Sequence, residues 1–187
     1  MAPLRTRVCL IGPECTGKTT LAGQLADYFS APWAPEFARE YASRVGRLLT
    51  FDDVEPIARG QMALEDAATT DNRQPTTSFL TILDTDLIST VVYATHYYGR
   101  CPEWIKAEAR ARKADLYLLT DIDVPFIADS LRDSAAPRET LYGKFAQTLK
   151  EYEANVVPIT GERFAAAVTQ LDSLRDRPPA AARNPRR

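Results

Sequence analysis

A segment near the beginning of the chain has the residue types of a phosphate-binding loop. Residues 12–19, GPECTGKT, fit the pattern G-x-x-x-x-G-K-[ST] in full, with an apolar run before them and a helical pattern after them. Glycines at both positions of the pattern let the backbone turn so that successive N–H groups face an anion. The helix that follows adds its positive end. The segment therefore predicts that the chain holds the phosphates of a nucleotide.

The side chains of this loop extend the prediction to a nucleoside triphosphate with magnesium. Lys18 can reach the β- and γ-phosphates as a cation, and the Thr19 hydroxyl can join the coordination of Mg²⁺. We expect ATP and Mg²⁺ as cofactors. The residues expected to bind the nucleotide are Gly12, Glu14, Cys15, Thr16, Gly17, Lys18, Thr19 and Thr20.

A carboxylate closes another apolar run of the chain. Asp84 ends the segment FLTILD, where a nucleotide-bound magnesium ion needs an acidic side chain, usually through water. Asp86 follows in the same predicted crevice. Because both residues precede a helical pattern, capping of that helix is an alternative role for either one. We assign Asp84 to the metal, and both carboxylates to the substrate site.

The segment WAPEFARE is the candidate site for the group that receives the phosphate. Glu36 can bind a sugar hydroxyl or take its proton as a general base, and Asp86 is the alternative base. Arg39 can pair with a phosphate or with Glu40. A helix start with an ordinary surface ion pair is the alternative interpretation of these three charges.

Two aromatic residues and two arginines complete the candidate site. Trp33 and Phe37 can stack on a planar ring, although core packing is an alternative for each. Arg132 and Arg138 flank the small, polar segment DSAAP, within a lid expected at about residues 126–140. Arginines of such a lid can close on phosphates and neutralise charge during transfer, and a solvated connection between helices is the alternative.

The candidate residues follow apolar segments that alternate with helical patterns. We expect strands within residues 5–12, 76–84, 115–120 and 155–160, and a short one within 31–40. We expect helices within residues 17–29, 38–47, 53–69, 85–99, 101–114 and 161–174, and a long helix that ends near residue 154. This alternation predicts a P-loop α/β domain with three α/β/α layers and a mainly parallel sheet of about five strands. In such sheets ligands bind beyond the carboxyl ends of the strands.

The composition is that of one globular domain. The 187 residues carry a net charge of -2, so no global positive field attracts nucleic acid or anionic lipid. No apolar run reaches the roughly 20 residues of a membrane span. Three scattered cysteines and a single histidine give no disulfide framework and no multi-histidine metal site, which fits a reducing cytoplasm. We expect a kinase domain over residues 1–174 and a disordered basic tail over 175–187.

Three classes of nucleotide-binding protein compete at this point. A GTPase switch needs an N-K-x-D element after a late strand, and residues 120–123 read TDID instead. A motor or regulatory ATPase usually needs more chain for a sensor or a partner surface. A small-molecule kinase needs an acceptor pocket and an arginine-bearing lid, and the sequence offers candidates for both. The composition and motifs therefore favour a kinase with a small-molecule partner.

The order of the segments GPECTGKTTLA, PEFARE, ILDTDLISTVVYATHYYG, LYLLTDIDVPFIADSLR and FAQTLKEYEANVVPITG resembles the ribosylnicotinamide kinase domain of the bacterial NadR family. The resemblance covers residues 7–174. It implies transfer of the ATP γ-phosphoryl group to the ribose 5′-hydroxyl of nicotinamide riboside, which gives nicotinamide mononucleotide for NAD salvage. It places the nucleoside near Glu36, Arg39, Asp84 and Asp86, and the lid on Arg132.

The sequence departs from the family pattern in two places. Full-length NadR proteins carry an H-x-G-H signature in a nucleotidyltransferase domain, and a single histidine cannot supply it. We therefore do not expect this chain to adenylylate the mononucleotide or to act as a repressor. Pro35 stands where the family tends to place a tryptophan, and Trp33 is the nearest tryptophan. The alternatives are a kinase of a different nucleoside, and a regulatory ATPase or GTPase without a nucleoside acceptor.

Overall fold

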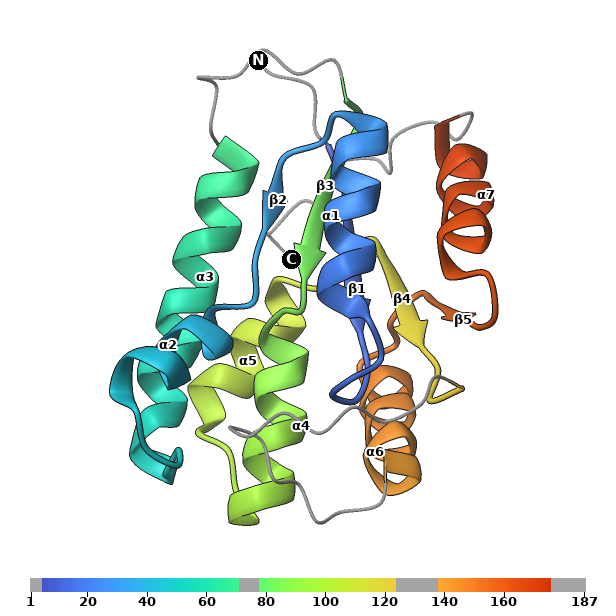
Figure 1. Ribbon diagram of the computed structural model, residues 1–187. Coiled ribbons are helices and arrows are strands. Elements are labelled where there is room, and N and C mark those ends of the chain that lie inside the picture. Colours follow the sequence, from blue (N-terminus) through green and yellow to red (C-terminus); the bar gives the residue numbers. More distant parts are fainter. Residues whose placement is uncertain (1–4, 71–77, 124–137, 176–187) are drawn as a thin grey trace, which may run out of the picture.

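The computed structural model describes residues 5–70, 78–123 and 138–175. Its centre is a parallel sheet with the strand order β2-β3-β1-β4-β5 (Figure 1). The strands are β1 (Thr6–Ile11), β2 (Trp33–Ala34), β3 (Leu80–Asp84), β4 (Leu116–Thr120) and β5 (Val156–Ile159). All four pairs of neighbouring strands are parallel, so all five carboxyl ends lie at one edge of the sheet. That edge carries the candidate site.

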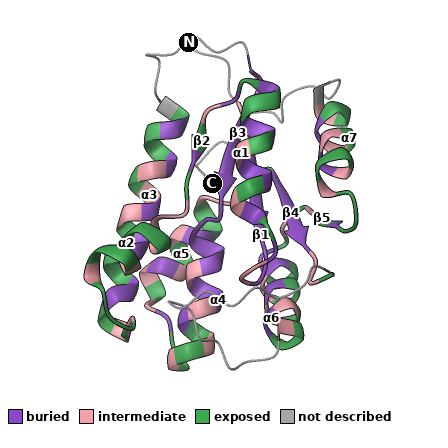
Figure 2. Cartoon of the chain, in the orientation of Figure 1, coloured by how far each residue is buried: buried purple, intermediate pink, exposed green. Residues whose placement is uncertain are grey.

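Helices cover both faces of the sheet because alternate residues of each inner strand point to opposite sides. Val8 and Leu10 of β1 pack with α1 (Lys18–Phe29) and α7 (Arg163–Arg175). Cys9 and Ile11 point to the other face, where the covering helices are α3 (Val54–Thr70), α4 (Leu87–Tyr98), α5 (Glu103–Ala111) and α6 (Arg138–Glu151). Buried residues therefore fill both faces of the inner strands (Figure 2).

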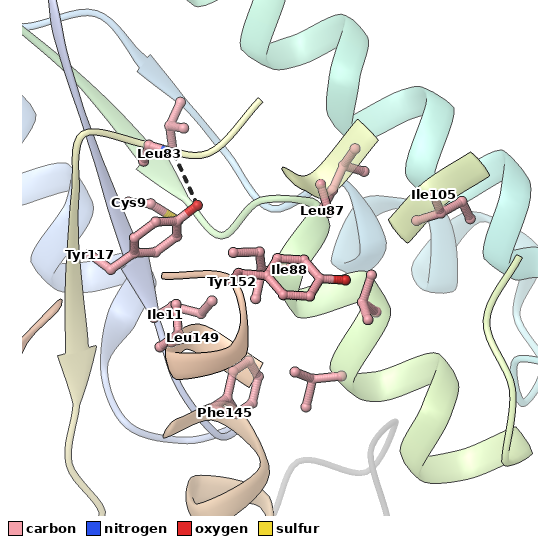
Figure 3. Close-up of a cluster of buried hydrophobic side chains, with 14 of the residues drawn as sticks. Cys9, Ile11, Leu83, Leu87, Ile88, Ile105, Tyr117, Phe145, Leu149 and Tyr152 are labelled. Carbon is pink, nitrogen blue, oxygen red and sulfur yellow. Dashed lines mark hydrogen bonds between the residues drawn. The ribbon is translucent and has the colours of Figure 1, made fainter. Parts of the chain in front are cut away.

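The larger of the two cores lies between the sheet and the helices α3 to α6. Tyr117 and Phe145 are its largest fully buried side chains, and Figure 3 shows them with Tyr152, Leu149 and Ile105. Burying large apolar side chains of this kind supplies about 1.5–3 kcal/mol each. This packing fixes α4 against the ends of β1 and β3, where the candidate site lies.

Two short elements precede α3 at the carboxyl edge. Helix α2 (Phe37–Val45) follows β2, and the single turn η1 (Phe51–Asp53) leads into α3. In Figure 1 the arrows of β3 and β4 point downward, and α2 and α4 lie toward the lower part of the molecule. Both helices are therefore placed to line a site beyond the strands.

The structure confirms the expected α/β fold, and the sheet is entirely parallel. Every strand and helix named from the sequence is present, with ends that differ by a few residues. Within residues 5–70, 78–123 and 138–175, no helix is long and apolar enough to cross a lipid bilayer. Residues 126–137 of the expected lid and residues 176–187 of the expected tail lie outside the described residues.

Candidate active site

The phosphate-binding loop connects β1 to α1 and adopts backbone angles that favour glycine. Gly12 has a φ of 140°, and a Cβ atom built there would lie 2.8 Å from both the carbonyl and the hydroxyl oxygen of Thr120. Gly17 has a φ of 80° and caps the amino end of α1. Cys15 also has a positive φ, of 55°. Only glycine fits at position 12, because any side chain would collide with β4.

Hydrogen bonds hold the loop in a closed turn. The Thr16 hydroxyl donates to the carbonyl oxygen of Pro13 at 2.9 Å and lies 2.7 Å from the Thr120 hydroxyl. The Lys18 ammonium group donates to the same Pro13 carbonyl at 2.6 Å, and its side chain is buried. The ammonium group therefore points into the loop, where phosphate oxygens would lie.

Asp84 ends β3 next to this loop. It is fully buried, and neither carboxylate oxygen has a hydrogen-bond partner of ordinary geometry among the described residues. Burial raises the pKa of the Asp84 carboxyl, the nearby Thr19 hydroxyl lowers it, and the Glu36 carboxylate raises it. A buried carboxylate without a partner carries a desolvation cost that a bound cation would remove.

The residues around Asp84 fit magnesium. Mg²⁺ prefers oxygen ligands and usually needs only one or two protein groups beside phosphate oxygens and water. Asp84 and the Thr19 hydroxyl supply such oxygens, with the Glu36 carboxylate near them. The described residues contain no cluster of three or more metal-ligating His, Cys, Asp or Glu side chains, so phosphates or water would have to complete the shell.

Asp86 has a different environment, which corrects its expected place in the substrate site. It is buried and caps α4, where one carboxylate oxygen accepts from the backbone N–H of Ile88 at 2.9 Å. The other oxygen accepts from the Tyr117 hydroxyl at 2.6 Å. Because both oxygens already have donors and Asp86 does not line the cavity described next, the capping alternative is the one that the structure supports.

A cavity of about 390 Å³ opens beside the phosphate-binding loop. Glu14 of the loop and Glu36 at the start of α2 both line it, so it adjoins the phosphate site. The remaining wall comes from α2, from residues 47–50, from α3, from Thr85 and from α4. The α4 residues are Ser89, Thr90, Tyr93, Ala94, Tyr97 and Tyr98. A mostly apolar cleft with a few polar groups, next to a phosphate site, suits a small organic acceptor.

Glu36 and Arg39 lie where the sequence predicts them. The Glu36 side chain is 10% exposed and faces the cavity, and one of its oxygens lies 3.6 Å from the Arg39 guanidinium. Arg39 is mostly exposed, and its charge still lowers the pKa of Asp84 after the larger effects of burial and its closer neighbours. The pair therefore belongs to the same electrostatic environment as the metal candidate.

The two aromatic residues expected to stack on a ring are not at this cavity, and the prediction is corrected. The Phe37 ring packs against α3, where a Cβ atom at Gly60 would lie 2.1 Å from it. Trp33 lies in a separate groove with Pro35, between α1 and α3. The aromatic residues of the cavity are the three tyrosines of α4, Tyr93, Tyr97 and Tyr98.

The arginines of the expected lid are only partly described. Arg138 begins α6, and its guanidinium lies 3.5 Å from the carbonyl oxygen of Cys15 in the phosphate-binding loop. It is therefore close enough to meet a phosphate held there. Arg132 lies outside the described residues.

The chain matches one family model, described as an AAA domain, over residues 7–165. It belongs to that family. The AAA domain match spans the phosphate-binding loop, the cavity and most of both cores.

Curated relatives of this AAA domain chain include a trifunctional NAD biosynthesis/regulator protein, NadR. The Salmonella typhimurium protein is 28% identical over 158 residues, which cover 81% of this chain and 37% of NadR. The Escherichia coli protein is 28% identical over 163 residues, which cover 84% of this chain and 38% of NadR. The resemblance to NadR noted in the sequence is thus confirmed, and the chain spans well under half the length of these relatives.

Solved structures support the fold. A NadR protein in complex with NR has a TM-score of 0.78 at 24% identity, with 94% of this chain and 52% of that chain covered. A NadR protein in complex with NAD and AMP-PNP has a TM-score of 0.76 at 25% identity, covering 91% and 49%. Thymidylate kinase from Ehrlichia chaffeensis has a TM-score of 0.59 at 14% identity, covering 92% and 100%.

Proposed function

We propose that this AAA domain chain is an ATP-dependent kinase that phosphorylates the ribose 5′-hydroxyl of nicotinamide riboside. The observation that carries the proposal is the shared wall of two sites: Glu14 of the phosphate-binding loop and Glu36 both line the acceptor cavity. An acceptor seated there would have its hydroxyl next to the outermost phosphate. Matches to NadR proteins, including one solved with NR, direct the choice of acceptor.

The phosphates are held by the loop N–H groups and by Lys18. The ammonium group exchanges its Pro13 contact for phosphate oxygens, and the amino end of α1 adds its positive dipole. Thr19 and Asp84 would hold Mg²⁺, which neutralises charge on the phosphates when bound. Arg138, at the rim of the loop, and Arg132 are the arginines assigned to charge that develops during transfer.

Glu36 is the proposed general base. The 5′-oxygen forms a bond to the γ-phosphorus, the bond from that phosphorus to the bridging oxygen of ADP breaks, and the hydroxyl proton passes to the Glu36 carboxylate. Asp86 is a poorer candidate because its two oxygens accept from Tyr117 and Ile88. Most of the rate gain in such a transfer comes from positioning and electrostatics.

The tyrosines of α4 give the cavity its preference for a planar ring. Tyr93 and Tyr97 lie parallel within 7°, with ring centroids 6.1 Å apart. The Arg47 charge in the cavity wall is paired with Asp53, so Glu14, Glu36 and these electron-rich rings favour a ring that carries positive charge, as the pyridinium of nicotinamide riboside does.

The test is ADP release from ATP and Mg²⁺ with a panel of nucleosides. We expect release that depends on nicotinamide riboside, and a fall in kcat of at least about 100-fold in Glu36→Gln with ATP affinity unchanged. Glu40→Gln is the matched control, because Glu40 is an exposed residue of the same helix that does not line the cavity. Slow release that ignores every nucleoside would instead indicate a regulatory ATPase or GTPase.

A further inference from the structure

The connection between α2 and η1 forms part of the wall of the acceptor cavity. Arg47, Leu48, Leu49 and Thr50 all line it. This connection projects from the fold, since Leu48 is 78% exposed. A wall made of an exposed connection needs a fixed anchor if it is to keep its shape.

The anchor is one buried carboxylate. Asp53 is 3% exposed and accepts two hydrogen bonds from the Arg47 guanidinium, at 2.7 and 2.9 Å. It also accepts from the Thr50 backbone N–H at 2.7 Å, from the Thr50 hydroxyl at 3.1 Å and from the Tyr41 hydroxyl at 2.9 Å. Both Asp53 oxygens are thus used, and Asp53 itself does not line the cavity.

The hydrogen bonds found at residues 47–50 converge on Asp53. Apart from its bonds to Asp53, the Arg47 guanidinium donates a hydrogen bond to the carbonyl oxygen of the adjacent Leu48 at 2.9 Å. The capping box between Thr50 and Asp53 begins η1, so the same carboxylate fixes the start of the next element. The Arg47 guanidinium and the other donors hold the pKa of Asp53 well below its usual range. Asp53 therefore stays ionised at neutral pH.

We propose that Asp53 is a positioning residue that holds residues 47–50 against the acceptor, and that it sets the affinity for the nucleoside without contacting it. The inference rests on the proposed function, because it assigns the cavity to the acceptor. A bidentate pair between Arg47 and a carboxylate fixes both distance and orientation. Replacing Asp53 by Asn removes the charge and one acceptor oxygen while keeping the shape of the side chain.

The experiment compares Asp53→Asn with the wild-type chain. We expect KM for nicotinamide riboside to rise at least about tenfold, with kcat and KM for ATP within about twofold. We expect amide hydrogen exchange to accelerate at residues 47–50 and to stay unchanged in α1. Asp66→Asn is the control, because Asp66 is an exposed α3 residue paired with Arg112 outside the cavity lining. Should Asp53→Asn fail to fold, Tyr41→Phe removes one of the donors to Asp53 at a side chain that does not line the cavity, and a smaller rise in the same KM is expected.

The outcomes separate the two proposals. Faster exchange at residues 47–50 with an unchanged KM for the nucleoside would overturn the positioning role and leave the kinase assignment standing. A fall in kcat together with a rise in KM for ATP as large as the rise in KM for the nucleoside would also overturn the positioning role. The Asp53 carboxylate would then affect the whole site and not the acceptor alone. Wild-type protein that releases no ADP in response to any nucleoside would overturn the proposed function itself.

Discussion

The hydroxyl groups of Thr16 and Thr120 lie 2.7 Å apart and join the phosphate-binding loop to the end of β4. Thr120 also donates to the carbonyl oxygen of Ile11 at 3.2 Å, so one buried side chain connects the last residue of β1, the loop and the neighbouring strand. The loop thus takes its shape from the sheet as well as from its own glycines.

Thr120→Val should loosen the loop. The valine keeps the side-chain shape and removes the hydroxyl, so we expect the dissociation constant for ATP to rise by about three- to tenfold, the value of one buried hydrogen bond. Nucleotide titration measures this. Thr81→Val is the control: the Thr81 hydroxyl is buried in β3 with no partner among the described residues, so its loss should leave ATP affinity intact. An unchanged ATP affinity in Thr120→Val would mean that the phosphate-binding loop keeps its conformation without the Thr120 hydroxyl.

Asp84→Asn should affect turnover more than nucleotide binding. The amide removes the charge that suits Mg²⁺, so we expect the Mg²⁺-dependent rate to fall at least about 100-fold while ATP affinity changes by less than about fivefold. Steady-state kinetics across a magnesium titration gives both values. Asp172→Asn, on the exposed side of α7, should behave as wild type. Equal losses in binding and in rate would remove the metal assignment.

Tyr97→Ala should weaken acceptor binding. Tyr97 lines the cavity and is 46% exposed, so its loss should raise KM for the nucleoside by about five- to thirtyfold with little effect on stability. Tyr28→Ala is matched in residue type and is 58% exposed, but it lies on α1 beside Phe164. If both variants shift KM alike, the effect is not local to the cavity.

Glu65 should make stability depend on pH. Burial raises the pKa of Glu65 from its ordinary value of 4.5 to about 7, although the Arg7 guanidinium lies 2.8 Å from its carboxylate. Because the folded pKa is the higher one, the unfolded chain loses this proton first, and the contribution to stability falls as pH rises from 4.5 to about 7.

Glu65→Gln removes that titration. Between pH 4.5 and about 7 we expect the Tm of Glu65→Gln to vary less with pH than the wild-type Tm. Outside this window the two plots of Tm against pH should have similar slopes. Thermal unfolding in a series of buffers measures this, and Asp66→Asn provides an exposed neighbour on α3 for comparison. Parallel curves for Glu65→Gln and wild type would mean that Glu65 ionises alike in both states.

Much of the fold was predictable because local patterns carry it. The phosphate-binding loop needs glycine at positions 12 and 17, and both positions have the positive φ that the motif implies. The sequence could locate Asp84 and Glu36 near one another because Asp84 ends β3 and Glu36 follows β2, and the carboxyl ends of parallel strands lie together. Their roles in metal and acceptor binding stay predictions. These inferences need only the order of elements.

The aromatic wall was not predictable in the same way. Trp33 begins β2 and Phe37 follows it next to Glu36, yet the Phe37 ring packs toward α3 and Trp33 lies in another groove. Tyr93 and Tyr97 are one helical turn apart, so the sequence predicts that they share a face of α4. It does not predict whether that face packs in the core or lines a cavity. Likewise, the five bonds on Asp53 join α2 to η1 and depend on how those elements pack.

The close approach of Phe37 to Gly60 has an evolutionary consequence. Since the ring occupies the space where a Cβ atom at position 60 would lie, position 60 can gain a side chain only if the ring at position 37 moves or is lost. Chains of this family that carry alanine or a larger residue at position 60 should have lost the aromatic ring at position 37, and the entrance to α2, with Glu36 on it, should then sit differently. Covariation between these two columns would therefore trace how acceptor preference diverged.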